Sequence, residues 1–253
     1  DLVHRMYLEL DGTTSSGINT GSAAIVDVEL EIGGQKIDKQ TGEWMEVWAE
    51  LTESNPSRVV GQIGQNGSGT LFQDMSGMGG CLGVHIAADA SGNWANEAAR
   101  DTAVAGLENK KLFVPLQFWF CRNPGLALPL IALQYHEVKV VTTFTNVPGT
   151  GTGFDAKLWA DYIYLDTDER RRFAQVSHEY LIEQVQFQSA PGTNSTSDEL
   201  NFNHPVKALF WTAYGSTSAA LGAAKLQLNG HDRAAEQPHD YYHLVQPYEC
   251  GLG

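Results

Sequence analysis

The sequence has little cysteine, little positive charge and no long apolar run, and each shortage excludes a class of protein. Its 253 residues include three cysteines that lie far apart without CxxC spacing, too few for a disulfide scaffold or a thiolate zinc site, which favours a reducing compartment. Sixteen basic residues against 30 acidic ones leave a net charge of -14, which disfavours direct binding to nucleic acid or to an anionic membrane. The longest apolar stretch, residues 126–133, contains Pro129 and is shorter than the roughly 18 residues that a membrane-spanning helix needs.

Strand patterns dominate the chain. The period-2 alternation of a strand with one wet face occurs in three segments: Met6–Leu10, Val26–Ile32 and Val138–Phe144. Leu112–Phe120 and Leu158–Leu165 are apolar on both faces, which predicts strands covered by a layer on each side. Residues 44–51 alone favour a helix, with apolar residues at i, i+3, i+4 and i+7 and Thr41 as the N-cap. The predicted fold class is therefore all-β, a sandwich or a barrel.

An internal repeat predicts that a β-domain is duplicated. Glu29–Gln35 has a counterpart in Lys225–His231, the same strand entering a glycine-containing turn. A strand pattern precedes each copy and an aromatic segment follows it; the strand patterns are Leu2–Leu10 and Val206–Thr212, and the aromatic segments are Trp44–Trp48 and Tyr241–Tyr248. We expect two domains, residues 1–175 and 176–253. By comparison of the two copies, about two thirds of the second is expected to be absent, and its few strands should be poorly stable by themselves.

Motifs for catalysis or metal binding are missing. The sequence contains no GxSxG nucleophile elbow and no Walker loop, and no glutamate follows His239 as a zinc-protease motif with His243 requires. We therefore expect no catalytic residue, no metal and no cofactor. Asn66 and Asn194 each begin an N-x-S/T sequon in a loop rich in Gly, Ser and Thr, so both are candidate glycosylation sites.

The segment Leu112–Val140, LFVPLQFWFCRNPGLALPLIALQYHEVKV, closely resembles the signature of the major capsid proteins of nucleocytoplasmic large DNA viruses. Three further stretches agree with the family in order: Val28–Asp38, Asp161–Gln186 and Leu226–Arg233. The resemblance implies a double jelly roll, each a β-sandwich, and three subunits that form a pseudo-hexagonal capsomer. Relative to that family, the sequence lacks strands expected before Asp1 and others expected after Gly253. The first jelly roll is thus expected to be nearly complete and the second truncated.

The resemblance places several residues in a structural motif: Trp119, Arg122, Asn123, Pro124 and Gly125. Along Leu112–Phe120 every second residue, from Leu112 to Phe120, is expected on one side of a strand, and Trp119 on the other. Pro124 and Gly125 suit the two central positions of a type II turn. Arg122 beside it is either solvated, as in an ordinary tight turn, or part of the motif.

A cluster of charges of both signs lies where the first domain is expected to meet the second. It contains Asp166 and Asp168, which resemble the start of a calcium loop, but Arg171 and Arg172 stand where that loop would continue. We predict instead that these charges pair across the junction and fix the orientation of the two jelly rolls.

The resemblance implies a structural subunit and no enzyme. Its partners would be further copies of itself in a homotrimer, neighbouring capsomers and minor capsid proteins, in the capsid of a virion assembled in the host cytoplasm. A carbohydrate-binding jelly-roll module is the alternative, and exposed Trp or Tyr side chains lining one groove would favour it. A β-sandwich glycosidase would need two carboxylates about 5 to 9.5 Å apart in a cleft.

Overall fold

The computed structural model describes residues 1–13, 20–53, 71–79, 110–145, 155–189, 197–211 and 222–250. The chain divides into two compact units, Asp1–Val185 and Gln186–Gly253. The boundary expected after residue 175 coincides with the end of helix α6 (Thr167–Gln175), whereas the division of contacts falls after Val185. The two units are described separately.

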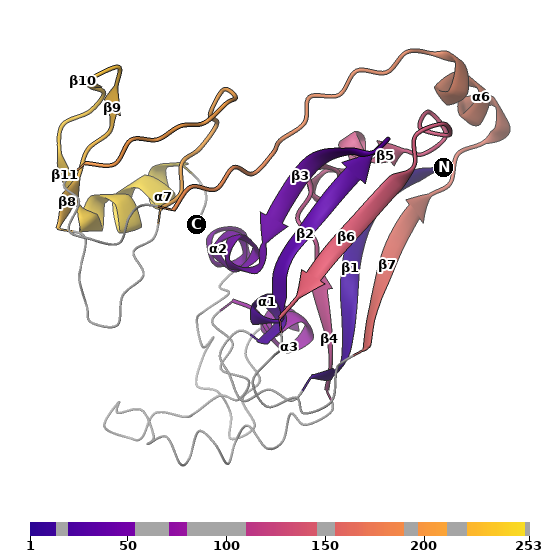
Figure 1. Ribbon diagram of the computed structural model, residues 1–253, viewed down its shortest axis with the longest axis horizontal. Helices are drawn as coiled ribbons and strands as arrows, with labels where there is room; N and C mark the ends of the chain where they lie inside the picture. The colour runs from indigo at the N-terminus through magenta and orange to yellow at the C-terminus, as the bar shows by residue number, and fades with distance from the viewer. Residues whose placement is uncertain are drawn as a thin grey trace. The chain divides into compact units, whose positions relative to one another are not determined.

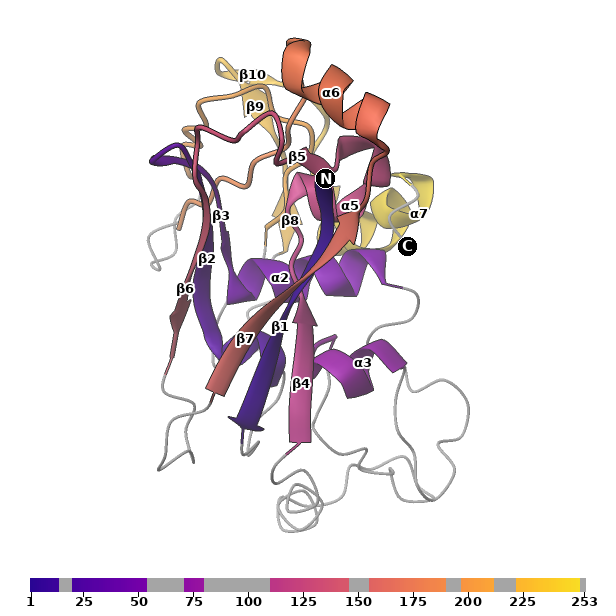
Figure 2. The same ribbon diagram turned by 90° about the vertical axis from the view of Figure 1, so that its right-hand side faces the viewer.

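The first unit is a sandwich of two antiparallel sheets that face each other (Figures 1 and 2). In one sheet β1 lies between β4 and β7, and the short β5 pairs with the start of β1; in the other sheet β2 lies between β3 and β6. The bounds are Leu2–Thr13 for β1, Ile25–Ile32 for β2, Gln35–Thr41 for β3, Lys110–Pro115 for β4, Leu128–Pro129 for β5, Val138–Phe144 for β6 and Asp155–Ile163 for β7. This arrangement confirms the predicted all-β sandwich.

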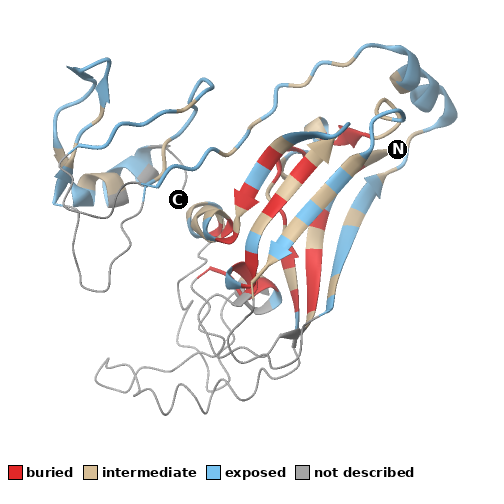
Figure 3. Ribbon diagram, in the orientation of Figure 1, coloured by how far each residue is buried: buried red, intermediate tan, exposed pale blue. Residues whose placement is uncertain are grey.

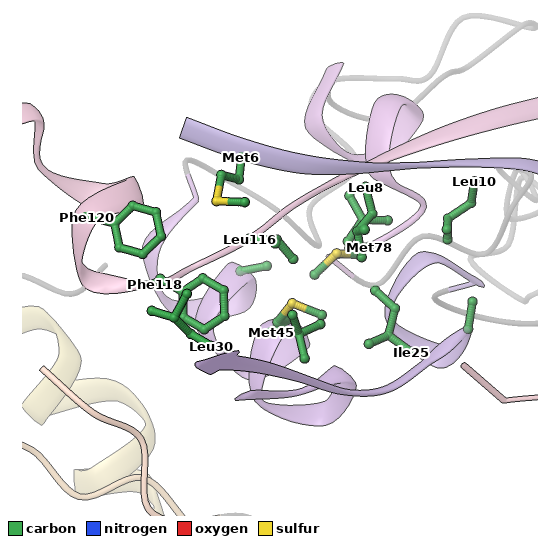
Figure 4. Close-up of a cluster of buried hydrophobic side chains, with 14 of the residues drawn as sticks. Met6, Leu8, Leu10, Ile25, Leu30, Met45, Met78, Leu116, Phe118 and Phe120 are labelled. Carbon is green, nitrogen blue, oxygen red and sulfur yellow. The ribbon is translucent and has the colours of Figure 1, made fainter. Parts of the chain in front are cut away.

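The core fills the space between the two sheets, where buried residues recur at every second strand position (Figure 3). Leu8 and Leu10 of β1 face Val28 and Leu30 of β2, and other apolar side chains close the core around them, as Figure 4 shows; these include Met45, Met78, Leu116, Phe118 and Phe120. Burying each of these side chains contributes about 1.5 to 3 kcal/mol. The predicted alternation of Met6–Leu10 and of β6 is confirmed.

Val26 does not follow the alternation of its strand and is 46% exposed. The pairing of β2 with β6 is irregular here, because Ile25 lies opposite Phe144 while Asp27 lies opposite Thr143. Val26 is therefore an extra residue in the strand, as in a β-bulge, which turns its side chain away from the core and lets Ile25 point inward instead. The prediction that Val26 shares the dry face of Val28 was wrong.

Leu112–Phe120 is not one continuous strand. Strand β4 ends at Pro115; the Leu116 N–H still donates to the Met6 carbonyl at 2.9 Å, and helix α5 (Trp119–Arg122) then follows. The helical turn places both Trp119 and Phe120 in the core, with their rings edge to face 5.2 Å apart. The predicted burial of alternate residues holds through Phe120, but the expected position of Trp119 on the opposite face was wrong.

Helix α2 (Gly42–Thr52) is confirmed, with the Thr41 hydroxyl accepting the Trp44 N–H at 3.1 Å. Its buried face is different from the one predicted, since Met45 and Ala49 point into the core while the predicted stripe from Trp44 to Leu51 is half-buried. A Cβ at Gly42 would collide with the backbone carbonyls of Ser22 and Ile25. The first turn of α2 therefore lies directly against these carbonyls, where no side chain would fit.

The remaining short helices of the first unit lie at the ends of the sheets and in the connections between strands. They are α1 (Thr20–Ala23), α3 (Leu71–Ser76) and the 3₁₀ helix η2 (Pro124–Leu126). Within the described ranges, no helix is both long and apolar enough to cross a membrane.

The second unit repeats one hairpin of the first. Strands β9 (Gln227–Leu228) and β10 (His231–Asp232) pair through a turn in which Asn229 and Gly230 have φ of 52° and 79°; in the β2–β3 turn, Gly33 and Gly34 have φ of 60° and 79°. Two consecutive positive φ values are typical of a type I′ hairpin turn. Helical turns follow each hairpin: α2 in the first unit, and η3 (Tyr241–Val245) with α7 (Gln246–Cys250) in the second. The predicted repeat of the hairpin is confirmed.

Elsewhere the second unit holds little regular structure in its described part. Strands β8 (Ala223–Ala224) and β11 (Gln237–Pro238) form another short pair, and none of the residues of this unit whose burial is described is buried. Residues 206–211 form no strand, so the strand predicted over Val206–Thr212 is wrong for the residues that the structure describes.

Candidate assembly surfaces

An aromatic row crosses the outer surface of the sheet that contains β1. Tyr7 on β1 lies between Phe113 on β4 and Trp159 on β7, with ring centroids 5.9 and 6.4 Å from that of Tyr7. These three residues point away from the core because their neighbours Met6, Leu8 and others point into it. We call Tyr7, Phe113 and Trp159 the aromatic face.

Trp159 is held in place although its side chain is 49% exposed. Its indole Nε1–H donates to Glu9 Oε2 at 2.6 Å, and Lys111 Nζ lies 3.1 Å from both Glu9 and Asp11. The hydrogen bonds from Lys111 and Trp159 lower the pKa of Glu9, so this carboxyl is ionised at neutral pH. An aromatic group fixed in this way loses little conformational entropy when a partner covers it.

Strand β7 adds apolar groups on its other side. Leu158 lies opposite the buried Leu8 and Tyr162 opposite Val3, yet Leu158 is 44% exposed. Among the described strands, β7 pairs with β1 alone and so is an edge strand. The prediction that Leu158–Leu165 is covered on both faces was wrong for the described residues, because Leu158, Trp159 and Tyr162 are each 44 to 49% exposed and no residue of β7 is buried. An edge with exposed apolar groups on both faces is a common place for association.

The outer surface of the other sheet is charged. Lys39 Nζ lies 2.9 Å from Asp27 and 3.2 Å from Glu29, and Lys36 Nζ lies 2.6 Å from Glu29. Hydrogen bonds from these lysines lower the pKa of Asp27 and of Glu29. We call these four residues the charged face; its charges neutralise one another across neighbouring strands and stay partly hydrated.

The signature segment turns by a 3₁₀ helix. Asn123 caps η2, its Oδ1 accepting the Gly125 N–H at 2.8 Å, and Pro124 takes the first helical position. The predicted type II turn was wrong, because Gly125 does not have the positive φ which that turn requires. Arg122 has partners: it pairs with Glu183 at 3.0 Å and lies 4.6 Å above the centre of the Trp48 ring.

Cys121, whose thiol is free, lies beside this turn. Burial raises the pKa of the Cys121 thiol to about 12, so it stays protonated at neutral pH. A protonated, buried thiol is a poor nucleophile. Its position suits a packing role.

The charged cluster lies on helix α6. Asp166 and Glu169 form a capping box at its start, Arg171 pairs with Asp168 at 3.4 Å, and Arg170 pairs with Asp1 at 2.6 Å. These described pairs all lie within the first unit, and Arg172 is exposed. Pairing across the junction between the units stays a prediction. Asn66 and Asn194 lie outside the described residues.

Sequence reasoning did not identify the aromatic face or the role of Arg170. Tyr7 and Trp159 are brought together by the pairing of β1 with β7, which no local pattern specifies. No pattern in the sequence indicates that Arg170 pairs with Asp1, 169 residues earlier.

Comparisons with known proteins were consistent with this architecture. The family model "Major capsid protein N-terminus" matches residues 6–166, and "Large eukaryotic DNA virus major capsid protein" matches residues 169–221. The chain is 44% identical to the major capsid protein of Pyramimonas orientalis virus, over 98% of this chain and 60% of that protein. It is 34% identical to the major capsid protein of Paramecium bursaria Chlorella virus 1, over 98% of this chain and 62% of that protein.

A solved structure agrees as well. A quasi-atomic model of the PBCV-1 virus capsid matches with a TM-score of 0.67 and 32% identity, over 98% of this chain and 67% of the matched chain. The fold is accordingly that of jelly-roll capsid proteins. The chain spans 60% of the length of the Pyramimonas orientalis virus protein. With a family model matching well over half of its residues, this chain belongs to the family of major capsid proteins of large eukaryotic DNA viruses.

Proposed function

We propose that this chain is part of a structural subunit that assembles into trimeric, pseudo-hexagonal capsomers, which tile an icosahedral virus shell. The observation that carries the proposal is the match, over 98% of this chain, to a protein that forms the PBCV-1 capsid. The subunit contacts copies of itself, neighbouring capsomers and minor capsid proteins in the virion, after assembly in the host cytoplasm. Its role requires no catalytic residue and no cofactor, and it makes no direct contact with nucleic acid.

The aromatic face supports self-association through the sheet that contains β1. Tyr and Trp are the residue types that dominate binding energy at protein interfaces, and those in the centre of a patch matter most. A net charge of -14 makes copies of the chain repel one another, so contact is most favourable where apolar groups can be buried. On the outer surface of the other sheet Val141 is also exposed, opposite Glu29, but the ion pairs of the charged face favour contact with water.

The test is the assembly state of the longer protein that contains this chain. Light scattering should give a mass of about three subunits, and electron microscopy should show particles of hexagonal outline. A stable monomer that binds glycans through Trp159 would overturn the proposal and favour a carbohydrate-binding module. The use of Asn66 and Asn194 as glycosylation sites is tested on the same sample by mass spectrometry before and after glycosidase treatment.

A further inference from the structure

Two polar residues occupy positions on β3 where the other core strands carry apolar ones. Asp38 is 4% exposed and Gln40 is 1% exposed. Asp38 Oδ1 accepts the Lys39 N–H at 2.9 Å and the Val185 N–H at 3.0 Å, and its Oδ2 accepts Gln40 Nε2 at 3.0 Å. The same Gln40 nitrogen also donates to the Gln117 carbonyl at 2.9 Å. Asp38 thus joins β3 to the last residue of the first unit.

The two residues before Val185 are held as well, each by a different element. The Gln184 side chain donates to the Ile37 carbonyl of β3. Glu183 pairs at 3.0 Å with Arg122, which ends α5 and itself lies over the Trp48 ring of α2. Three consecutive residues are therefore bound to β3 and α5, whereas Leu181, two residues earlier, is 89% exposed. We call Glu183–Val185, which ends the first unit, the connector. We call Asp38, Gln40 and Arg122 the connector seat.

Burying the polar side chains of Asp38 and Gln40 in the core costs free energy. Burial raises the pKa of Asp38, although the hydrogen bonds from Val185, Gln40 and Lys39 and the charge of Arg122 offset part of that rise. Gln40 Oε1 is buried and has no hydrogen-bond partner among the described residues. Apolar residues at both positions would avoid these costs, since a buried polar atom left unpaired is unfavourable. The advantage of polar groups here is that they bind the connector in one register.

We infer that the connector seat is preformed on the first jelly roll, that Asp38 is its positioning residue, and that it fixes the point at which the chain leaves this jelly roll. The inference rests on the assembly role proposed above and deepens it, because a hexagonal outline needs each subunit to present its two jelly rolls in a constant relation. It assigns to Glu183–Val185 the task that the sequence suggested for Asp166–Arg172.

The experiment compares Asp38→Ala, Asp38→Asn and wild type in the longer protein, with Lys39→Ala as the matched neighbouring control. Endoproteinase Glu-C cleavage after Glu183, between residues that the seat holds, measures release of the connector, and hydrogen exchange of the β2 amides measures the integrity of the core. We expect Asp38→Ala to raise the cleavage rate about 10- to 100-fold, as expected for the loss of hydrogen bonds to a charged acceptor. Exchange in β2 should stay near the wild-type rate. Asp38→Asn keeps an oxygen for the Lys39 and Val185 N–H groups but places an NH2 against the Gln40 Nε2 donor, so it should restore only part of the protection.

Two outcomes would overturn the inference. One is a cleavage rate in Asp38→Ala equal to that of wild type. The other is a rise in cleavage that always accompanies faster exchange in β2, which would mean that Asp38 only stabilises the fold. The cleavage assay does not require trimers. A failure of the wild-type protein to assemble would therefore reject the proposed function, while the effect of Asp38 on connector cleavage could still be measured.

Discussion

The two sheets of the first unit share one core but present opposite chemistry on their outer surfaces. On the charged face, Asp27 and Glu29 are neutralised by lysines of the neighbouring strand. On the aromatic face, Tyr7 and its neighbours contact one another, and a hydrogen bond from Trp159 to Glu9 holds the most exposed ring. The difference shows that the inward residues specify the sandwich, whereas the outward residues distinguish a surface for water from one for a partner.

The largest effects are expected for buried residues beneath the two faces. There the two sheets should respond alike to substitution. Leu8 under the aromatic face and Leu30 under the charged face are both buried. Replacing either with Ala should lower the free energy of unfolding by about 2 to 5 kcal/mol, because each leaves a cavity in the same core. Denaturant titration followed by tryptophan fluorescence measures both. The exposed Val26→Ala serves as the control, with an expected change within about 0.5 kcal/mol. A large loss for one leucine and almost none for the other would mean that the sheets do not share a core.

Substitutions of exposed residues should affect assembly differently on the two faces. In the longer protein, Trp159→Ala should raise the dissociation constant of the trimer at least about tenfold, since a central Trp of an interface often contributes 2 kcal/mol or more. Val26→Ala, which removes a similarly exposed apolar side chain next to the charged face, should leave assembly unchanged. Mass photometry across a dilution series gives both constants. Equal effects of the two substitutions would remove the distinction between the faces.

Acid should remove stabilising ionic interactions on both faces for the same physical reason. The expected effects are smaller than those of the substitutions above. The pKa values of Glu9 and Glu29 are lowered in the folded chain from the ordinary value of 4.5, so each carboxylate stabilises the fold above that pH and loses its contribution as the pH falls through the lowered value. Glu9→Gln and Glu29→Gln should each lower the thermal midpoint at pH 7. The difference from wild type should shrink progressively as the pH falls below 4.5. A difference that persists in acid would show that packing, and not ionisation, explains the effect.

Much of the sandwich was predictable from alternation, because burial of one strand face leaves a period of 2 in the sequence. The residues where prediction failed are those where another constraint intervenes. Val26 is displaced by a bulge, and the strand before Trp119 ends at a proline. Asp38 and Gln40 point inward although both are polar. At these positions of β3 the usual alternation, with apolar residues inward and polar residues outward, is therefore missing.

The candidate surfaces were less predictable than the fold. Tyr7, Phe113 and Trp159 belong to strands far apart in the sequence, and only the register of β1 with β4 and β7 brings their rings into contact. The edge position of β7 likewise depends on the order of strands in the sheet. The residues of a single strand carry little information on its register with its neighbours. The family signature compensated for this at the level of fold, but not for the individual contacts.

Thr41 is both the last residue of β3 and the cap of α2, so no loop separates the strand from the helix. Asp38, which accepts the Val185 N–H, and Trp48, which lies under Arg122, therefore belong to one strand and helix joined without a loop. We expect a force applied at Val185 to reach the interior of the sandwich through its hydrogen bond to the buried Asp38 carboxylate. Such a connection suits the constant subunit outline that the proposed assembly requires.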